Sequence, residues 1–220
     1  MTNTKSHKKL IGILFLLFMT ITVIALYFGI IVKQQKSVPM KQVKIDGVYL
    51  PQAQEISGFQ LTDNHGIAYK KSNLEGHWTM MFFGFTNCGM VCPTTLAELN
   101  KMYKTLEKEL PSNQMPNIVL VSVDPERDTV ERINEYVSAF NPHFIGARGD
   151  EAQIEALKKQ LHIVSAKMQT DQGKDHYTIN HSAEIMLFNP QAKLQAFLSY
   201  PHVADQMVSD YKLILTSTTL

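Results

Sequence analysis

The longest apolar run of the chain lies close to its beginning. Residues 10–32 contain no charged side chain, and as a helix rising 1.5 Å per residue they extend for about 35 Å, enough to cross a hydrocarbon core of about 30 Å. The apolar core of a cleaved signal peptide is shorter, about 7 to 15 residues, and is followed by a small-residue cleavage site. No such site follows Val32. We therefore predict a retained transmembrane anchor over residues 10–32, with a long signal peptide as the alternative.

The segments on either side of this anchor are polar. A short basic tail, residues 1–9, contains Lys5, Lys8 and Lys9, and more lysines follow the span, so the positive charges do not fix its orientation. The compact run KSHKK directly before the span is typical of an export signal. We expect a single-pass protein of the cell inner membrane whose soluble domain faces the periplasm or an equivalent compartment. Residues 33–50 show little apolar periodicity and predict a tether.

Within residues 51–220, apolar runs of strand length alternate with segments of helical periodicity. This alternation predicts one α/β domain whose crossover connections require parallel neighbouring strands. A turn signal at residues 63–66 predicts an N-terminal hairpin, and residues 184–198 predict a second hairpin that adds an antiparallel edge. Asp128 and Glu131 are expected to cap the helix that follows them. The predicted central strands are 78–85, 117–123 and 143–149, residues 163–169 are expected to be extended, and the predicted helices are 93–109, 129–140, 151–161 and 203–215.

The composition narrows the class of protein. Hydrophobic residues make up 45% and charged residues 19%, which is typical of a globular protein rather than a disordered one. The formal net charge is +1, and without the three lysines ahead of the span the chain has 18 basic and 20 acidic residues. A near-neutral body without a basic stripe argues against nucleic acid as a partner.

The only two cysteines, Cys88 and Cys92, lie in TNCGMVCP, where a predicted buried strand leads into a helix. Sites in open α/β sheets gather at the carboxyl ends of strands, and a helix N-terminus favours a thiolate. At this spacing the two sulfurs can bind one metal ion or form a disulfide, or the side chains can be two small buried hydrophobic groups. Spacing alone leaves these alternatives open.

Two thiolates leave a metal site incomplete, and His181 stands out by position among the eight histidines. It directly precedes a strand expected in the same sheet as residues 78–85. Two thiolates and one imidazole form a copper-type ligand set, whereas a structural zinc site usually has four ligands. A hydrogen-bonded structural histidine is the ordinary alternative. Asp124 ends the neighbouring strand, where an aspartate can orient His181, tune the thiols or cap a loop.

Taken in order, FTNCGMVCP, VSVDPERDT, FIGARGD and NHSAEIMLFNP resemble the Sco/SenC family of membrane-anchored copper-binding proteins, from about Gly58 to Tyr211. The resemblance implies a thioredoxin-like fold with extra elements, including the N-terminal hairpin, preceded by one transmembrane helix. It implies one copper ion, Cu(I) or Cu(II), bound through Cys88, Cys92 and His181.

The same resemblance implies a role in assembling the dinuclear copper centre of cytochrome c oxidase. The protein would deliver copper, keep the cysteines of that centre reduced, or do both. The implied partners are the oxidase subunit that holds the copper centre, a copper donor protein and a thiol reductant protein.

The sequence departs from the family pattern at three positions. The family usually has Cys-Pro-acid-x-Cys-Pro, and here Gly89 and Met90 replace the proline and the acid. We expect the loss of the acid to lower the pKa of the thiols and to leave the loop more mobile. We expect Met90 chiefly to pack against its surroundings, its thioether being a further donor for copper(I). Asn180 stands where the family often has aspartate. These changes are expected to alter affinity and redox potential rather than the ligand set.

A second function class also fits the residues. In a thiol–disulfide oxidoreductase, Cys88 would attack, Cys92 would resolve and no metal would be needed. A thiol peroxidase fits less well because no arginine is identified beside the thiol, and a redox-sensing binding module is a further alternative. The leading prediction is a metal-binding assembly factor, with thiol–disulfide reductase activity as the alternative function.

Overall fold

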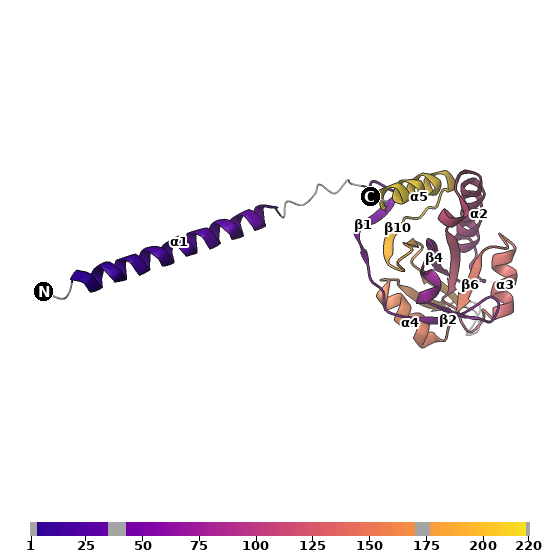
Figure 1. Cartoon of the computed structure of the whole chain (residues 1–220). Coiled ribbons are helices and arrows are strands. Elements are labelled where there is room, and N and C mark those ends of the chain that lie inside the picture. The colour runs from indigo at the N-terminus through magenta and orange to yellow at the C-terminus, as the bar shows by residue number, and fades with distance from the viewer. Residues whose placement is uncertain (1–3, 35–42, 170–176, 219–220) are drawn as a thin grey trace. The chain divides into compact units, whose positions relative to one another are not determined.

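The computed structural model describes residues 4–34, 43–169 and 177–218 (Figure 1). The chain divides into two units, Met1–Gln42 and Val43–Leu220.

The first unit is formed, in its described part, by helix α1 (Thr4–Gln34). The stretch Ile11–Gly29 has a mean hydropathy of 2.6, and none of it is buried within the structure. Within the described ranges, α1 is the one helix whose length and composition suit a membrane span. The predicted anchor, residues 10–32, lies inside this single helix, and residues 4–9 of the predicted tail continue it towards the N-terminus.

The second unit is a layered α/β structure (Figure 1). Two single 3₁₀ turns, η1 (Lys71–Leu74) and η2 (Ser112–Gln114), join its elements. Its strands are β1 (Gly47–Gln54), β2 (Gln60–Asp63), β3 (Ala68–Lys70), β4 (Thr79–Gly84), β5 (Asn117–Ser122), β6 (Ile145–Arg148), β7 (Ser165–Gln169), β8 (Tyr177–His181), β9 (Ile185–Phe188) and β10 (Leu194–Leu198). Its helices are α2 (Val91–Glu109), α3 (Val130–Ser138), α4 (Glu151–Gln160) and α5 (Ala204–Thr218).

Most of these strands form one sheet in the order β1-β10-β9-β4-β5-β6-β2-β3. The central strands β4, β5 and β6 are parallel, and antiparallel strands extend the sheet on both sides. β2 and β3 form the predicted N-terminal hairpin. The strands β7 and β8 pair with each other in a separate two-stranded ribbon.

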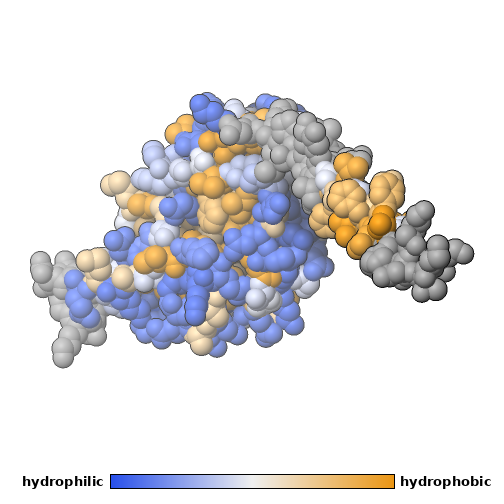
Figure 2. Space-filling view, turned by 90° about the vertical axis from the view of Figure 1, so that its left-hand side faces the viewer, coloured by the Kyte–Doolittle hydropathy of each residue, from blue (hydrophilic) through white to orange (hydrophobic). Residues whose placement is uncertain are grey.

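Side chains of β4 alternate between the two faces of the sheet, as in any strand. Met80 and Phe82 pack into a hydrophobic cluster with residues of α2, α3 and α5. Met81 and Phe83 pack on the other face with residues of α4 and with Ile179 of the ribbon. All four β4 side chains are at most 3% exposed, so β4 is buried on both faces, as its continuous apolar run predicts. On the surface shown in Figure 2, hydrophobic residues of this unit are interspersed with hydrophilic ones.

The predicted α/β class is confirmed, and the predicted central strands and helices are found with their ends shifted by at most three residues. The prediction of a tether over residues 33–50 is wrong at its C-terminal end. β1 begins at Gly47 and pairs with β10, so the expected edge hairpin is covered by another strand. Because β1 pairs along one side only, several of its residues face solvent, and its apolar pattern is weak. Residues 35–42 of the predicted tether lie outside the described residues.

Candidate metal centre

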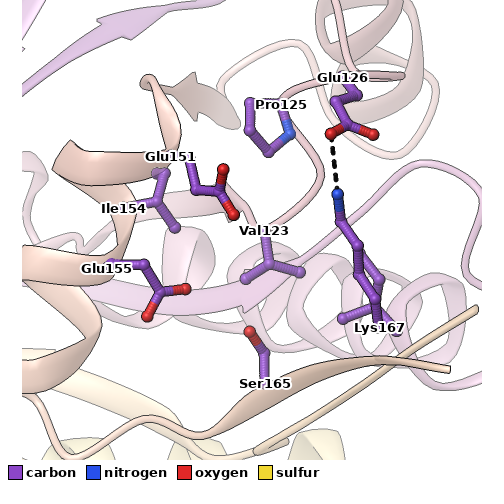
Figure 3. Close-up of a pocket in the computed structure, with 9 residues that line it drawn as sticks. Val123, Pro125, Glu126, Glu151, Ile154, Glu155, Ser165 and Lys167 are labelled. Atoms are coloured by element: carbon purple, nitrogen blue, oxygen red, sulfur yellow. Dashed lines mark hydrogen bonds and ion pairs between the residues drawn. The ribbon is translucent and has the colours of Figure 1, made fainter.

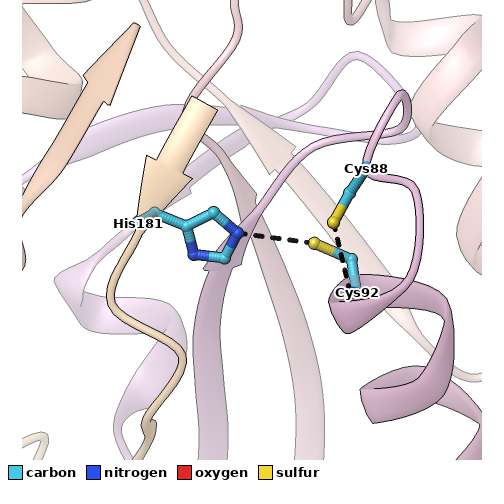
Figure 4. Close-up of side chains that lie close together, drawn as sticks. All are labelled: Cys88, Cys92 and His181. Carbon is cyan, nitrogen blue, oxygen red and sulfur yellow. Dashed lines mark hydrogen bonds between the residues drawn. The ribbon is translucent and has the colours of Figure 1, made fainter. Parts of the chain in front are cut away.

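Three side chains from distant parts of the chain converge beyond the carboxyl end of β4 (Figure 4). Cys88 lies in the loop that follows β4, Cys92 is the second residue of α2, and His181 is the last residue of β8. The two sulfurs and the nearest ring nitrogen all lie within 4.8 Å of one another. The three predicted ligands are therefore close enough for one ion to contact all of them, since the bonds of a metal such as zinc to sulfur and nitrogen are about 2.0–2.3 Å long.

Hydrogen bonds orient the imidazole towards the sulfurs. His181 Nδ1 lies 2.7 Å from the Ser182 carbonyl oxygen, which only accepts hydrogen bonds, so Nδ1 carries the proton. In the neutral ring this leaves the lone pair on Nε2, which lies 3.6 Å from Cys92 Sγ. The backbone N–H of Cys92 donates to Cys88 Sγ at 3.4 Å. The first turn of α2 therefore stabilises a negative charge on Cys88.

The cysteines differ in burial. Cys92 is 1% exposed, whereas Cys88 and His181 are half-buried. Gly84, the last residue of β4, makes room for the buried thiol, because a Cβ at this position would lie 2.9 Å from Cys92 Sγ and 2.8 Å from a methyl group of Leu120. The site is thus open to solvent on the side of Cys88 and closed on the side of Cys92.

A buried carboxylate holds the loop that precedes Cys88. Asp128 is fully buried and accepts hydrogen bonds from the Thr86 hydroxyl at 2.6 Å, the Thr86 backbone N–H at 3.2 Å and the Ser122 hydroxyl at 2.6 Å. The predicted capping role of Asp128 is wrong, since Thr129 is the N-cap of α3 and accepts from Arg132 N. The sequence signal was the second aspartate of VSVDPERDT, but its burial beside the cysteine loop depends on the tertiary fold.

The electrostatics distinguish the two thiols. The hydrogen bond with Cys92 is the largest cause that lowers the pKa of Cys88, to about 4, with further bonds from His181 and backbone N–H groups outweighing partial burial. The pKa of Cys92 is raised well above its usual range by its bond to the Cys88 sulfur, by burial and by the nearby negative charge. Burial lowers the pKa of His181, but its bonds to Cys88 and Ser182 outweigh this effect and raise it overall.

We therefore expect selective alkylation of Cys88 in the reduced chain. With a pKa of about 4, Cys88 is a thiolate at pH 6 and remains so down to about pH 5, whereas an ordinary thiol with a pKa of about 8.5 is less than about 1% ionised at pH 6. Iodoacetamide labelling at pH 5 to 8, read by peptide mass spectrometry, should modify Cys88 at a nearly constant rate and leave Cys92 unmodified. Faster labelling of Cys92, or a rise in Cys88 labelling centred near pH 8.5, would contradict this assignment.

Of the roles open to Asp124, a direct hydrogen bond that orients His181 is not observed. Asp124 is fully buried and instead accepts hydrogen bonds from the Tyr177 hydroxyl, at 2.6 Å, and from Arg127 Nε. Tyr177 is the first residue of β8, the strand that ends in His181. Asp124 is therefore connected to the candidate ligand through the strand and not through a direct hydrogen bond.

The three departures from the family pattern all lie on the surface of the site. Met90 is 75% exposed, so the expectation that it packs against its surroundings is wrong. A Cβ on Gly89 would meet nothing within 4 Å, and Asn180 is exposed. None of these three residues occupies the space between the two sulfurs and the imidazole, which leaves the predicted ligand set intact.

The fold and this cluster define a thioredoxin-like protein with a two-thiol, one-imidazole site. The SCO1/SenC family model matches residues 49–216. Two solved structures are similar. One is Arabidopsis thaliana ScoI with copper bound, 30% identical with a TM-score of 0.67, covering 73% of this chain and 98% of that one. The other is Bradyrhizobium japonicum ScoI with copper bound, 33% identical with a TM-score of 0.63, covering 71% of this chain and 96% of that one.

Sequence similarity to a curated relative points to the same family. The human mitochondrial SCO2 homolog is 33% identical over 149 residues, which are 68% of this chain and 55% of the relative. The matched part thus spans little more than half of that relative's length. The chain belongs to the SCO1/SenC family, and the predicted resemblance and the thioredoxin-like fold are both confirmed.

Proposed function

We propose that the protein binds one copper ion through Cys88, Cys92 and His181. The observation that carries the proposal is the convergence of the three donor atoms within 4.8 Å. It is supported by the copper-bound structures of relatives that are 30% and 33% identical to this chain. The donor set fits copper because thiolates are soft ligands that suit Cu(I), and imidazole suits Cu(II) as well.

The arrangement suits an ion that is cargo rather than a permanent cofactor. Cys92 is closed off from solvent, whereas Cys88 and His181 are half-buried at the open side of the site. A partner's thiolate or imidazole can therefore approach the ion from that side and replace one ligand at a time. We propose that the chain acts as a copper metallochaperone for the dinuclear copper centre of cytochrome c oxidase, with the oxidase subunit, a copper donor and a thiol reductant as partners.

The proposed location follows from the first unit. The uncharged run inside α1 would retain the protein in the cell inner membrane as a single-pass anchor, residues 10–32, with the copper domain on the periplasmic side. This side requires a reductant, because an oxidising compartment tends to bridge two adjacent thiols that must be reduced to bind metal. A full-length chain that high salt alone releases from membranes, or whose mature N-terminus follows Val32, would contradict a retained anchor.

One observation favours thiol–disulfide reduction as a second function. The pKa of Cys88 is lowered, which keeps it a thiolate that can attack a disulfide. Cys92 lies beside it, with its backbone N–H 3.4 Å from Cys88 Sγ, so its thiol is in place to resolve a mixed disulfide. The Cys88 thiolate would attack a client disulfide, forming a mixed disulfide and releasing one client thiolate. Cys92, losing its proton, would then displace the second client thiolate. The client gains two electrons and the Cys88–Cys92 pair is left as a disulfide, which the external thiol reductant must reduce.

Copper titration of the reduced full-length chain in detergent tests the proposed function. We expect one copper ion per chain, because the cluster formed by Cys88, Cys92 and His181 is the one three-ligand group found in the described part of the chain. Cu(I) competition with a chromophoric chelator would give the affinity, and elemental analysis would give the stoichiometry. Failure of the reduced chain to hold copper against the chelator would refute the metallochaperone function and favour thiol–disulfide reduction as the function.

A further inference from the structure

The ribbon that carries His181 is not joined to the main sheet by a backbone ladder. Within the described residues, β7 and β8 are paired only with each other, whereas both cysteines are positioned by β4 and α2. A cavity of about 450 Å³ lies between the ribbon, α4 and residues 123–126 (Figure 3). The ribbon therefore forms one wall of this cavity, and side-chain contacts rather than backbone hydrogen bonds must set its position.

One face of β8 carries both an attachment point and the candidate ligand. Side chains two residues apart share a face of a strand, so Tyr177, Ile179 and His181 point the same way. Ile179 is 6% exposed and packs into the core under the ribbon, while Thr178 and Asn180 are exposed. Tyr177 and His181 stand at opposite ends of this face, about 13 Å apart along the strand.

Tyr177 is tied to the loop after β5 by several contacts. Its single O–H donates to Asp124 Oδ1 at 2.6 Å, with Glu126 Oε2 a second and more distant acceptor at 3.2 Å. The Arg127 guanidinium lies 3.7 Å from the centre of its ring and donates to its backbone carbonyl at 3.1 Å. Asp124 is fully buried and also bonds Arg127, so the acceptor of the tyrosine hydroxyl is itself fixed. Hydrogen bonds to charged groups of this kind are stronger than neutral ones.

Apart from His181 itself, a second polar contact between the ribbon and the rest of the domain is found among the described residues, and it is weaker. Lys167 of β7 forms an ion pair with Glu126 at 3.0 Å across the mouth of the cavity (Figure 3), but the side chains are 43% and 63% exposed, and exposed pairs contribute little. At the far end of the ribbon, the bonds of Ser182 to Val164 stay within the ribbon and its extension. The cluster around Tyr177 is thus the main polar attachment of the strand that ends in His181.

We propose that Tyr177 is a positioning residue for the third copper ligand. The inference rests on the proposed copper function and goes beyond it. Its hydroxyl, held by Asp124 and Glu126, fixes the start of β8 and thereby where His181 Nε2 lies relative to the two sulfurs. Copper(II) needs the imidazole as a harder donor, whereas copper(I) is satisfied by two thiolates. Loss of the hydroxyl therefore weakens copper(II) binding selectively.

The test compares Tyr177→Phe with the wild type in the reduced full-length chain in detergent. We expect Cu(I) affinity within about twofold of the wild type and Cu(II) affinity about tenfold weaker, the size of one lost hydrogen bond to a charged group. The sulfur-to-copper(II) absorption band should weaken and shift. Tyr69→Phe is the matched control, because the Tyr69 hydroxyl is buried without a hydrogen-bond partner among the described residues. That variant should match the wild type in both oxidation states.

Two outcomes would overturn the proposal: Cu(II) affinity and absorption unchanged in Tyr177→Phe, or equal losses of Cu(I) and Cu(II), which would indicate a general role in folding. A wild-type chain that binds no copper would refute the proposed function itself. If Tyr177→Phe does not fold, Glu126→Ala removes an exposed acceptor of the same hydroxyl and the Lys167 ion pair. This variant should bind Cu(II) about threefold more weakly than the wild type and Cu(I) with unchanged affinity. If both affinities equal those of the wild type, the proposal is overturned.

Discussion

Replacement of either Cys88 or Cys92 by serine is expected to abolish tight copper binding. Copper(I) prefers thiolates to oxygen ligands, and a serine hydroxyl is neither soft nor ionised near neutral pH. Loss of a group that merely orients a metal ligand typically costs about 10- to 100-fold in affinity, so loss of one of two thiolates should exceed that range. Chelator competition with the reduced chain would measure the change for both oxidation states.

Met90→Leu is the matched control for the serine variants. It removes a sulfur atom from the same loop, but the Met90 side chain is 75% exposed, and a side chain of similar size and polarity replaces it. Copper affinity should stay within about twofold of the wild type, because the two thiolates remain. Undiminished affinity in Cys88→Ser would rule out the three-ligand site, and a loss in Met90→Leu as large as in Cys88→Ser would assign the thioether a place among the ligands.

The serine variants also separate binding from folding. Cys92 is 1% exposed, and a buried hydroxyl without a partner destabilises a protein by about 1 to 3 kcal/mol. Cys88 is half-buried, so its replacement should cost less. A thermal melt that falls more for Cys92→Ser than for Cys88→Ser, with copper binding lost in both, would show that the loss comes from the missing ligand and not from unfolding.

The thiol half of the site could be predicted because it is local in sequence. Cys88 and Cys92 follow an apolar run long enough for a buried strand and precede a segment of helical periodicity. This order alone places them at the carboxyl end of a strand and the start of a helix. The structure has them there, in the loop after β4 and in the first turn of α2.

The position of His181 could be predicted only in part. The strand after it, β9, does pair with β4, as expected. His181 itself belongs to β8, which pairs with β7 outside the main sheet. The short exposed strands of a two-stranded ribbon carry few apolar residues, and four of the five residues of β7 are exposed. The extended segment 163–169 that contains β7 could be predicted, but β8 and its pairing with β7 could not.

The supporting carboxylates show why the rest of the site could not be predicted. Asp124 and Asp128 both occur in VSVDPERDT, and both are fully buried. One fixes the ribbon through Tyr177, and the other fixes the cysteine loop through Thr86. From the sequence alone, each of these two aspartates could equally well cap a loop or a helix. Their different partners, Tyr177 for Asp124 and Thr86 for Asp128, are both more than 40 residues away along the chain.

Replacement of His181 by alanine is expected to weaken the binding of Cu(II) and to leave the binding of Cu(I) almost unchanged. The thiolates of Cys88 and Cys92 remain, so Cu(I) binding should stay close to that of the wild type. Cu(II) loses its nitrogen donor, and the sulfur-to-copper(II) charge-transfer band of the wild type should disappear. His65→Ala is the matched control, because His65 is exposed on the turn between β2 and β3 and should leave both oxidation states unchanged.

The same variant also separates the metallochaperone from the reductase. Thiol–disulfide exchange needs an attacking thiolate and a resolving thiol, and both remain in His181→Ala, so any reductase activity should survive. In cells that lack the wild-type gene, His181→Ala should fail to restore an oxidase with its copper centre if copper delivery requires the imidazole. Full rescue by His181→Ala, with Cys88→Ser inactive, would make thiol reduction the function that the cell requires and leave copper binding as a property of the same two sulfurs.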